Sequence, residues 1–171
     1  MIAIRCTKKL LVRVGAQSPV PAPTTAILGD WYARPVAVRH QRLVLLISEH
    51  SRLPVVMPAR DVKHLATGFP EALSLVLLGL ALPPSAVERE VAEAREAVIA
   101  KTNSHSHLGT LIDFSYLLAG YVENAPELDL VALALWLSRT PVTPLGGNSP
   151  DRVTRELLTQ TSEETQERQS R

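Results

Sequence analysis

The segment KTNSHSHLGTLIDF, residues 101–114, contains two histidines two positions apart, and a carboxylate follows six residues after the second. In an extended chain His105 and His107 would point the same way, and with Asp113 they could bind a divalent metal ion. The remaining ligands would have to come from distant residues such as His40, Glu49 or His50. Since the polar residues before Leu108 equally suit a helix N-cap flanked by solvated histidines, we predict no metal site.

Asp113 and Cys6 are the other candidates for catalysis. Asp113 lies in the apolar run LIDF, where an unpaired carboxylate is costly to bury, so we expect it to pair or to face solvent. Cys6 lies among basic residues at a strand-to-helix junction, where its thiol could become a nucleophile or could simply be a small buried residue. One hypothesis is therefore a small hydrolase or nuclease that uses Asp113 with His105, His107 or Cys6.

The charge of the chain is concentrated in its first third. Residues 1–60 contain nine Lys or Arg and only two acidic residues, net +7, whereas all 171 residues together carry +1. These side chains could contact phosphates, although no helix-turn-helix, RNA-recognition or zinc-finger signature accompanies them. The candidates are Arg5, Lys8, Lys9, Arg13, Arg34, Arg39 and Arg42. The alternative is ordinary solvated charge.

Aromatic residues are scarce, and the known nucleotide and hydrolase motifs are missing. Phe, Trp and Tyr make up 4% of the chain, so few rings are present on which bases could stack. No Walker A loop, G-x-G-x-x-G or G-x-S-x-G occurs, which removes the commonest nucleotide-binding and hydrolase families. In LGDWY, residues 28–32, Trp31 and Tyr32 could anchor a partner or close a loop onto the sheet.

The first 60 residues predict a strand, a helix and a β-meander. A strand over 2–6 is followed by a helix that Thr7 begins and Gly15 ends, and a Pro-rich loop covers 16–30. Three apolar runs between 31 and 59 predict the meander. Because LVLLIS does not alternate, we expect it to be the central strand, and prolines place the last run near an edge.

The remaining residues predict mainly helices. A helix over 61–82 is expected to break at Gly68 and Pro70, further helices cover 85–96, 109–124 and 126–140, and AVIAKTN is the last strand. The fold class is α+β, with a small, mostly antiparallel sheet and helices concentrated in the C-terminal half. Residues 1–150 form one domain, and 151–171 form a short helix with a frayed or disordered polar tail.

Composition limits the environment that we expect. The single cysteine allows neither an intramolecular disulfide nor a cysteine zinc cluster, and the N-terminus lacks the apolar core of a signal peptide. The longest apolar segment has only about 13 residues, below the ~18 to 20 needed to cross a bilayer. We therefore expect a cytoplasmic protein with no membrane contact and no cofactor.

Three blocks of the sequence resemble a bacterial family of small domains of unknown function, found in genomes, plasmids and mobile gene cassettes. The blocks are IRCTKKLL, then LGDWYA with LVLLISEHSRLPVVMPAR, then LGTLIDFSYLL with LSRTPVTPLGG. The family begins with an RCTKKL-like block, and Ile112 takes the Asn position of its L-G-x-x-N-D-F pattern. The resemblance implies one fold-sized unit over residues 2–150 and no known activity. The site residues that it implies are Arg5, Thr7, Lys8, Trp31, Asn103 and Asp113.

These observations lead to one main hypothesis. We predict a non-enzymatic binding or accessory module, of a mobile element if the resemblance extends so far, whose basic first third meets a protein or a nucleic acid. A third hypothesis is self-association through the apolar segments LALALWL and VLLGLAL, which would make the protein a homo-oligomer.

Overall fold

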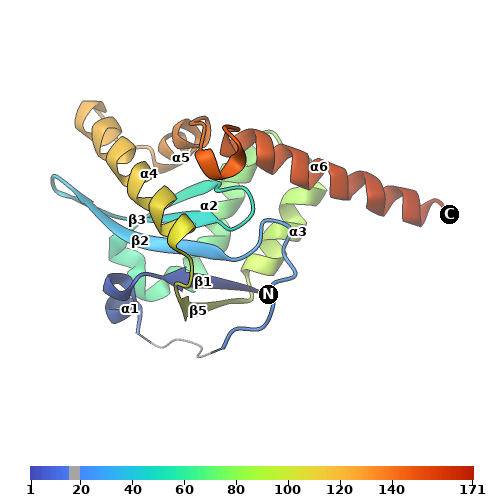
Figure 1. The fold of residues 1–171 in the computed structure, drawn as a ribbon, viewed down its shortest axis with the longest axis horizontal. Helices are drawn as coiled ribbons and strands as arrows, with labels where there is room; N and C mark the ends of the chain where they lie inside the picture. The colour runs from blue at the N-terminus through green and yellow to red at the C-terminus, as the bar shows by residue number, and fades with distance from the viewer. Residues whose placement is uncertain (16–19) are drawn as a thin grey trace.

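A five-stranded sheet in the order β4-β3-β2-β1-β5 forms the centre of the protein (Figure 1). The computed structural model describes residues 1–15 and 20–171, so part of the predicted loop 16–30, namely 16–19, lies outside the described residues. The strands are β1 Ile2–Cys6, β2 Trp31–Val38, β3 Gln41–Ser48, β4 Pro54–Pro58 and β5 Ala97–Lys101. The predicted first strand, meander and late strand are therefore confirmed.

The sheet is mixed, which corrects one detail of the prediction. β1 runs parallel to both β2 and β5, whereas β2, β3 and β4 form the antiparallel meander. The expectation of a mostly antiparallel sheet was wrong because β1 enters the sheet between β2 and β5. Helices lie in the chain between β1 and β2 and between β4 and β5, and such long connections allow parallel pairing.

Helices cover both faces of the sheet. They are α1 Lys8–Val14, η1 Ala59–His64, α2 Leu65–Gly79, α3 Pro84–Ala94, α4 His105–Asn124, α5 Leu130–Ser138, η2 Thr143–Leu145 and α6 Pro150–Gln169. Side chains alternate along β2, so Trp31 contacts Phe69 of α2 with ring centroids 4.8 Å apart, while Tyr32 stacks on His107 of α4. α2 and α4 therefore lie on opposite faces (Figure 1).

Four helices differ from their predicted bounds. α4 begins at His105, four residues before its predicted start, and α5 begins at Leu130, four residues after its own. The break expected at Gly68 and Pro70 lies earlier, between η1 and α2, and α2 passes through Pro70. Burial of Leu65, Phe69 and Leu73 on one stripe holds this helix against the sheet despite the proline. α6 extends to Gln169, where the sequence predicted a helix only to about residue 160. The domain boundary at residue 150 stays a prediction.

The core is built mainly from Leu, Val, Ile and Ala, as the scarcity of aromatics requires. All side chains from 43 to 48 of β3 are buried, as predicted for a strand covered on both faces, but β2 and not β3 is the central strand. β4 lies at an edge, as its prolines predicted. Within the described ranges, no helix combines the length and hydrophobicity that a membrane span requires.

Candidate functional site

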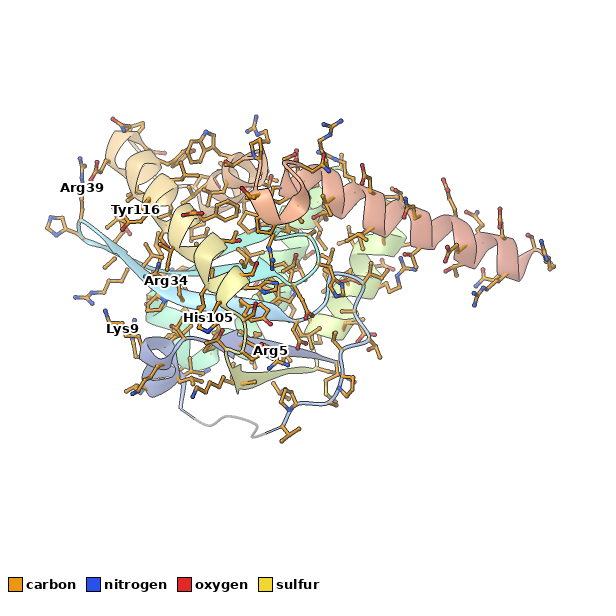
Figure 2. All side chains as sticks on the ribbon, in the orientation of Figure 1. Arg5, Lys9, Arg34, Arg39, His105 and Tyr116 are labelled. Atoms are coloured by element: carbon orange, nitrogen blue, oxygen red, sulfur yellow. The ribbon has the colours of Figure 1, made fainter. Side chains whose placement is uncertain are left out.

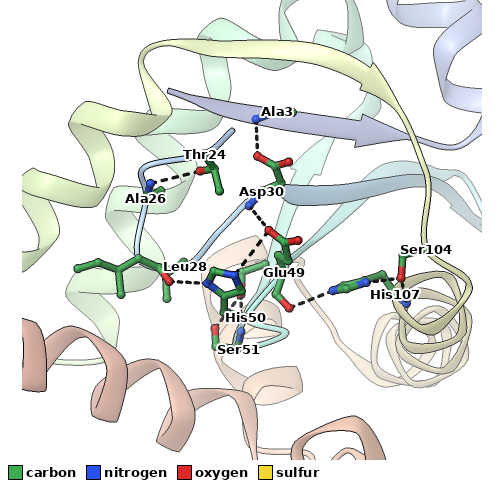
Figure 3. A network of polar contacts seen from close by, with 12 residues as sticks. Ala3, Thr24, Ala26, Leu28, Asp30, Glu49, His50, Ser51, Ser104 and His107 are labelled. Atoms are coloured by element: carbon green, nitrogen blue, oxygen red, sulfur yellow. Dashed lines mark hydrogen bonds and ion pairs between the residues drawn. The ribbon is translucent and has the colours of Figure 1, made fainter. Parts of the chain in front are cut away.

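A buried polar network joins β1 to the residues just before β2 (Figure 3). Asp30 is only 5% exposed, and its carboxylate accepts hydrogen bonds from the Ala3 amide at 2.8 Å and from Arg5 Nε at 3.0 Å. Arg5 Nη2 also lies 2.9 Å from Asp30 Oδ2, and the Asp30 amide donates to Glu49 Oε2. Arg5 is therefore paired with Asp30 inside the protein, which leaves it poorly placed to bind an external anion.

His107 connects this network to the start of α4. Its Nε2 lies 2.9 Å from the Glu49 carbonyl oxygen, which can only accept, so Nε2 donates. Its Nδ1 lies 2.6 Å from Ser104 Oγ, and its ring stacks on Tyr32 at 4.0 Å. Arg52 Nη1 donates to the same Glu49 carbonyl. With both ring nitrogens engaged, His107 fixes α4 onto the sheet and has no free nitrogen for a metal ion or a reacting proton.

Tyr32 and Arg52 complete the contacts between the sheet and α4. The Tyr32 hydroxyl donates to Asn103 Oδ1 at 2.8 Å, and burial, followed by the nearby Glu49 carboxylate, raises the pKa of Tyr32. Tyr32 therefore stays a protonated donor. Arg52 is 7% exposed and donates to Ser106 Oγ at 3.0 Å. These hydrogen bonds pair most of the buried polar atoms where α4 meets the sheet, so the contacts form a rigid junction and not an open catalytic centre.

The four candidate catalytic residues lie in different environments. Cys6 is fully buried, and desolvation raises the pKa of its thiol to about 12. His105 is exposed at the first position of α4, and Asp113 is exposed two turns further along. In the described part of the chain, no hydrogen bond or ion pair joins Asp113 to His105, His107 or Cys6, and no group of three His, Cys, Asp or Glu could hold a metal ion.

The structure brings together only some of the five predicted binding residues. Arg5 and Asn103 both belong to the network around Tyr32. Trp31 is 1% exposed and packs on the opposite face of the sheet, so it forms no part of this site. The Thr7 hydroxyl is buried without a hydrogen-bond partner among the described residues, and Lys8 is exposed on α1.

A basic pocket of about 530 Å³ lies between α1, the turn that joins β2 and β3, and η1. Its basic side chains are those of Arg13, His40, Arg42 and Arg60. Among the described residues, Arg60 is the only one of these four in an ion pair, with Asp61 at 3.7 Å, and both side chains of that pair are more than half exposed. The pocket therefore concentrates unpaired positive charge in a concave site, which raises the local concentration of anions.

Two further basic side chains, which we call the rim, come from elements that line the pocket. Arg39 projects from the β2–β3 turn and Lys9 from α1, and Figure 2 shows both, with Arg34, along one side of the molecule. We call the pocket together with Lys9 and Arg39 the basic surface. The sequence singled out Arg13, Arg39 and Arg42 by charge alone. It gave no sign that His40 and Arg60 face the same pocket, because the three segments meet only in the folded chain.

Comparison with known proteins gives one match. A family model described as "Domain of unknown function (DUF6933)" matches residues 3–153. Neither the curated proteins nor the solved structures gave a match. The matched range covers all of the sheet except Ile2, as well as the polar network and the basic surface, and it agrees with the extent of the family resemblance found in the sequence.

Proposed function

Because the chain belongs to the family Domain of unknown function (DUF6933), whose description states no activity, we propose from its own surface that the protein binds nucleic acid through backbone phosphates. The bacterial, mobile-element and cytoplasmic setting suggested by the sequence is part of this proposal. It deepens the idea of a binding module with a basic first third, and it selects nucleic acid as the partner.

The basic pocket is the observation that carries the proposal. Three arginines and a histidine from three separate segments line it, and a guanidinium group matches the oxygens of a phosphate in geometry as well as charge. Within the described residues, no carboxylate forms an ion pair with Arg13, His40 or Arg42. A bound phosphate would relieve the repulsion among these side chains, so the pocket favours an anion.

The basic surface is wider than one phosphate. Consecutive phosphates along a nucleic-acid strand are several ångströms apart, so a polyanion can contact the pocket and the Arg39–Lys9 rim together. A single small anion would occupy the pocket and leave the rim unused. This extent favours a nucleic acid over an isolated phosphate.

Arg39 supplies an independent argument from backbone strain. It is held at a φ of 52° in the turn between β2 and β3, a region in which glycine or asparagine is favoured. A non-glycine residue there costs about 1 kcal/mol or more. The presence of an arginine at a position where glycine would cost less is consistent with a role for the exposed guanidinium.

The surface chemistry supports contact with phosphates and not with bases. The large exposed aromatic side chains of the described residues, Tyr116 and Trp136, lie on α4 and α5 and not on the basic surface. Base stacking therefore has no platform beside the pocket. Binding should show little sequence preference and should weaken steeply with added salt.

Within the described parts of the chain, no contact favours the alternative of a hydrolase or nuclease. Such an enzyme needs an acid/base partner within hydrogen-bond reach of its nucleophile or through one water. The high pKa of the Cys6 thiol and the two engaged nitrogens of His107 supply no such partner. We therefore do not develop this alternative further.

The test is the binding of a labelled duplex, measured by fluorescence anisotropy at low salt. We expect the wild type to bind and the double variant Arg13→Gln with Arg42→Gln to bind about tenfold or more weakly, because two phosphate contacts are removed. Arg152→Gln, an exposed arginine of α6 away from the pocket, is the matched control and should change little. A wild type that binds neither DNA nor RNA, or a folded double variant with unchanged affinity, would contradict the proposal.

A further inference from the structure

A groove beside α4 forms a second candidate site, which is separate from the basic surface. It has a volume of about 310 Å³ and lies between α4 and residues 140–144. One wall comes from LGTLIDFSYLL and the other from LSRTPVTPLGG, so the two parts of the third block of the family resemblance face each other across it. Neither wall contains a residue of the basic surface.

The wall formed by α4 presents one carboxylate. Gly109, Asp113 and Leu117 line the groove at spacings of four residues, which places them on one stripe of the helix. Asp113 is exposed, and among the described residues it has no hydrogen bond and no ion pair. As far as the structure describes the chain, the lining of this groove contains no Lys, Arg or His. A carboxylate in a concave site without a cationic partner favours the binding of a positively charged ligand.

The opposite wall supplies hydrogen-bond acceptors and apolar surface. Thr140 and Thr143 contribute hydroxyl oxygens, and Pro141 and Pro144 have no backbone N–H, so this wall is poor in main-chain donors. Apolar side chains, including that of Phe114, line the rest of the groove. A ligand that fits this lining carries several N–H donors and a positive charge at one end and an aliphatic stem behind it.

Three arginines lie near the groove, and each has a hydrogen-bond partner of its own. Arg34 Nη1 donates to Ser115 Oγ at 3.3 Å, and Arg139, next to Thr140, donates through Nε to the Leu135 carbonyl at 3.4 Å. Arg52 donates to Ser106 Oγ at one end of the groove. Asp113 lies seven residues further along α4, about 10 Å away along the helix axis. Arg52 is buried and already bonded, and the distance is comparable with the screening length in physiological salt.

Gly109 has no intramolecular reason to be a glycine. It lies within α4, where glycine is less favourable than alanine, and a Cβ added there would meet nothing within 4 Å. Its place on the wall means that an added methyl group would occupy the groove itself. A side chain at position 109 would therefore narrow the groove.

We propose that this groove binds a primary aliphatic ammonium group, with Asp113 as its counter-ion. Thr140 and Thr143 accept the remaining N–H donors, and Leu117 and Phe114 pack against the stem. The ammonium group can belong to a free amine or to a lysine side chain of another molecule, because both present the same chemistry. This proposal does not depend on nucleic-acid binding.

The test is titration of the full chain, followed by nuclear magnetic resonance of the backbone amides. The probes are 1,5-diaminopentane for a free amine, N-acetyl-lysine methylamide for a lysine side chain, and N-acetyl-norleucine methylamide as the uncharged analogue. We expect shifts at Gly109, Asp113 and Thr143 with at least one of the two charged probes and not with the norleucine probe. Binding of the diamine alone would identify a free amine, and binding of the lysine derivative would identify a side chain.

Three variants make the result specific. Asp113→Asn should weaken binding about tenfold or more, since it removes the charge of the acceptor. Gly109→Ala should also weaken binding while it raises the thermal midpoint, because alanine favours the helix. Glu123→Gln, an exposed carboxylate on the last turn of α4, is the control and should bind like the wild type. Equal binding of the norleucine probe, no shift with either amine, or unchanged affinity in Asp113→Asn or Gly109→Ala would overturn the proposal.

Discussion

At the scale of single residues, burial decides which chemically capable side chains can react. Cys6 has basic neighbours in the sequence, which is the setting of an activated thiolate. In the strand, however, it points away from the face that Arg5 occupies, and its Sγ lies 3.6 Å from the Ile4 carbonyl oxygen inside the core. The sequence identified the residue type and its neighbours but could not show its exposure.

Cys6 should therefore be unreactive in the folded protein. With a pKa of about 12 the thiol is almost entirely protonated at pH 8, and burial also blocks access. We expect iodoacetamide to modify the native protein far more slowly than the urea-unfolded protein, as measured by mass spectrometry over time. Comparable rates in the two states would contradict the burial of Cys6.

Arg39 should show opposite effects on stability and binding. Arg39→Gly removes the steric penalty at a φ of 52° and should raise the free energy of unfolding by up to about 1 kcal/mol, less the entropy that glycine adds to the unfolded chain. The same change should weaken duplex binding. Urea unfolding and anisotropy measure the two effects, and a variant that is destabilised and binds normally would remove Arg39 from the basic surface.

At the scale of elements, sequence patterns predicted which segments form helices or strands better than they predicted which strands pair. The meander was predictable because its strands are close in sequence and joined by short turns. The pairing of β1 with β5 could not be predicted, because nearly one hundred residues separate the two strands and neither sequence indicates which strand lies beside it. The position of α2 shows the same limit, since burial of one apolar stripe outweighed the helix-breaking tendency of Pro70.

Glu90 of α3 links two elements and should give the stability a characteristic pH dependence. Its carboxylate accepts hydrogen bonds from the Ile27 and Leu28 amides, at 2.8 and 3.2 Å, and so holds the segment before β2. Burial raises the pKa of Glu90 above its ordinary value of 4.5. The folded state therefore binds this proton more tightly than the unfolded state does, so the associated stability is present at low pH and is lost as pH rises through the folded pKa.

Urea unfolding of the wild type and of Glu90→Gln, from pH 4 to pH 7, isolates this contribution. We expect the stability of the wild type relative to the variant to fall as pH rises above about 4.5, because glutamine does not titrate in this range. The difference between the two proteins cancels the titration of other carboxyls, including Glu93, whose lowered pKa acts in the opposite direction. A flat or rising difference would show that burial does not dominate the environment of Glu90.

At the scale of the whole molecule, several basic residues from the first third of the sequence form the basic surface. The net +7 of the first third was visible from composition, but Arg5 is neutralised by Asp30 and Arg52 is buried, so neither contributes to it. Of the other basic residues, Arg13, Arg42 and Arg60 converge on the basic pocket. This convergence depends on the packing of α1, the β2–β3 turn and η1, which no local pattern in the sequence encodes.

The salt dependence of duplex binding tests the central claim most directly. Each phosphate contact contributes about −0.9 to the slope of log affinity against log salt concentration, so about four contacts across the basic surface predict a slope of about −3 to −4. The double variant Arg13→Gln with Arg42→Gln should reduce the magnitude of this slope by about 2, while Arg152→Gln leaves it unchanged. An affinity that does not depend on salt, or a slope that the double variant does not alter, would contradict phosphate binding by the basic surface.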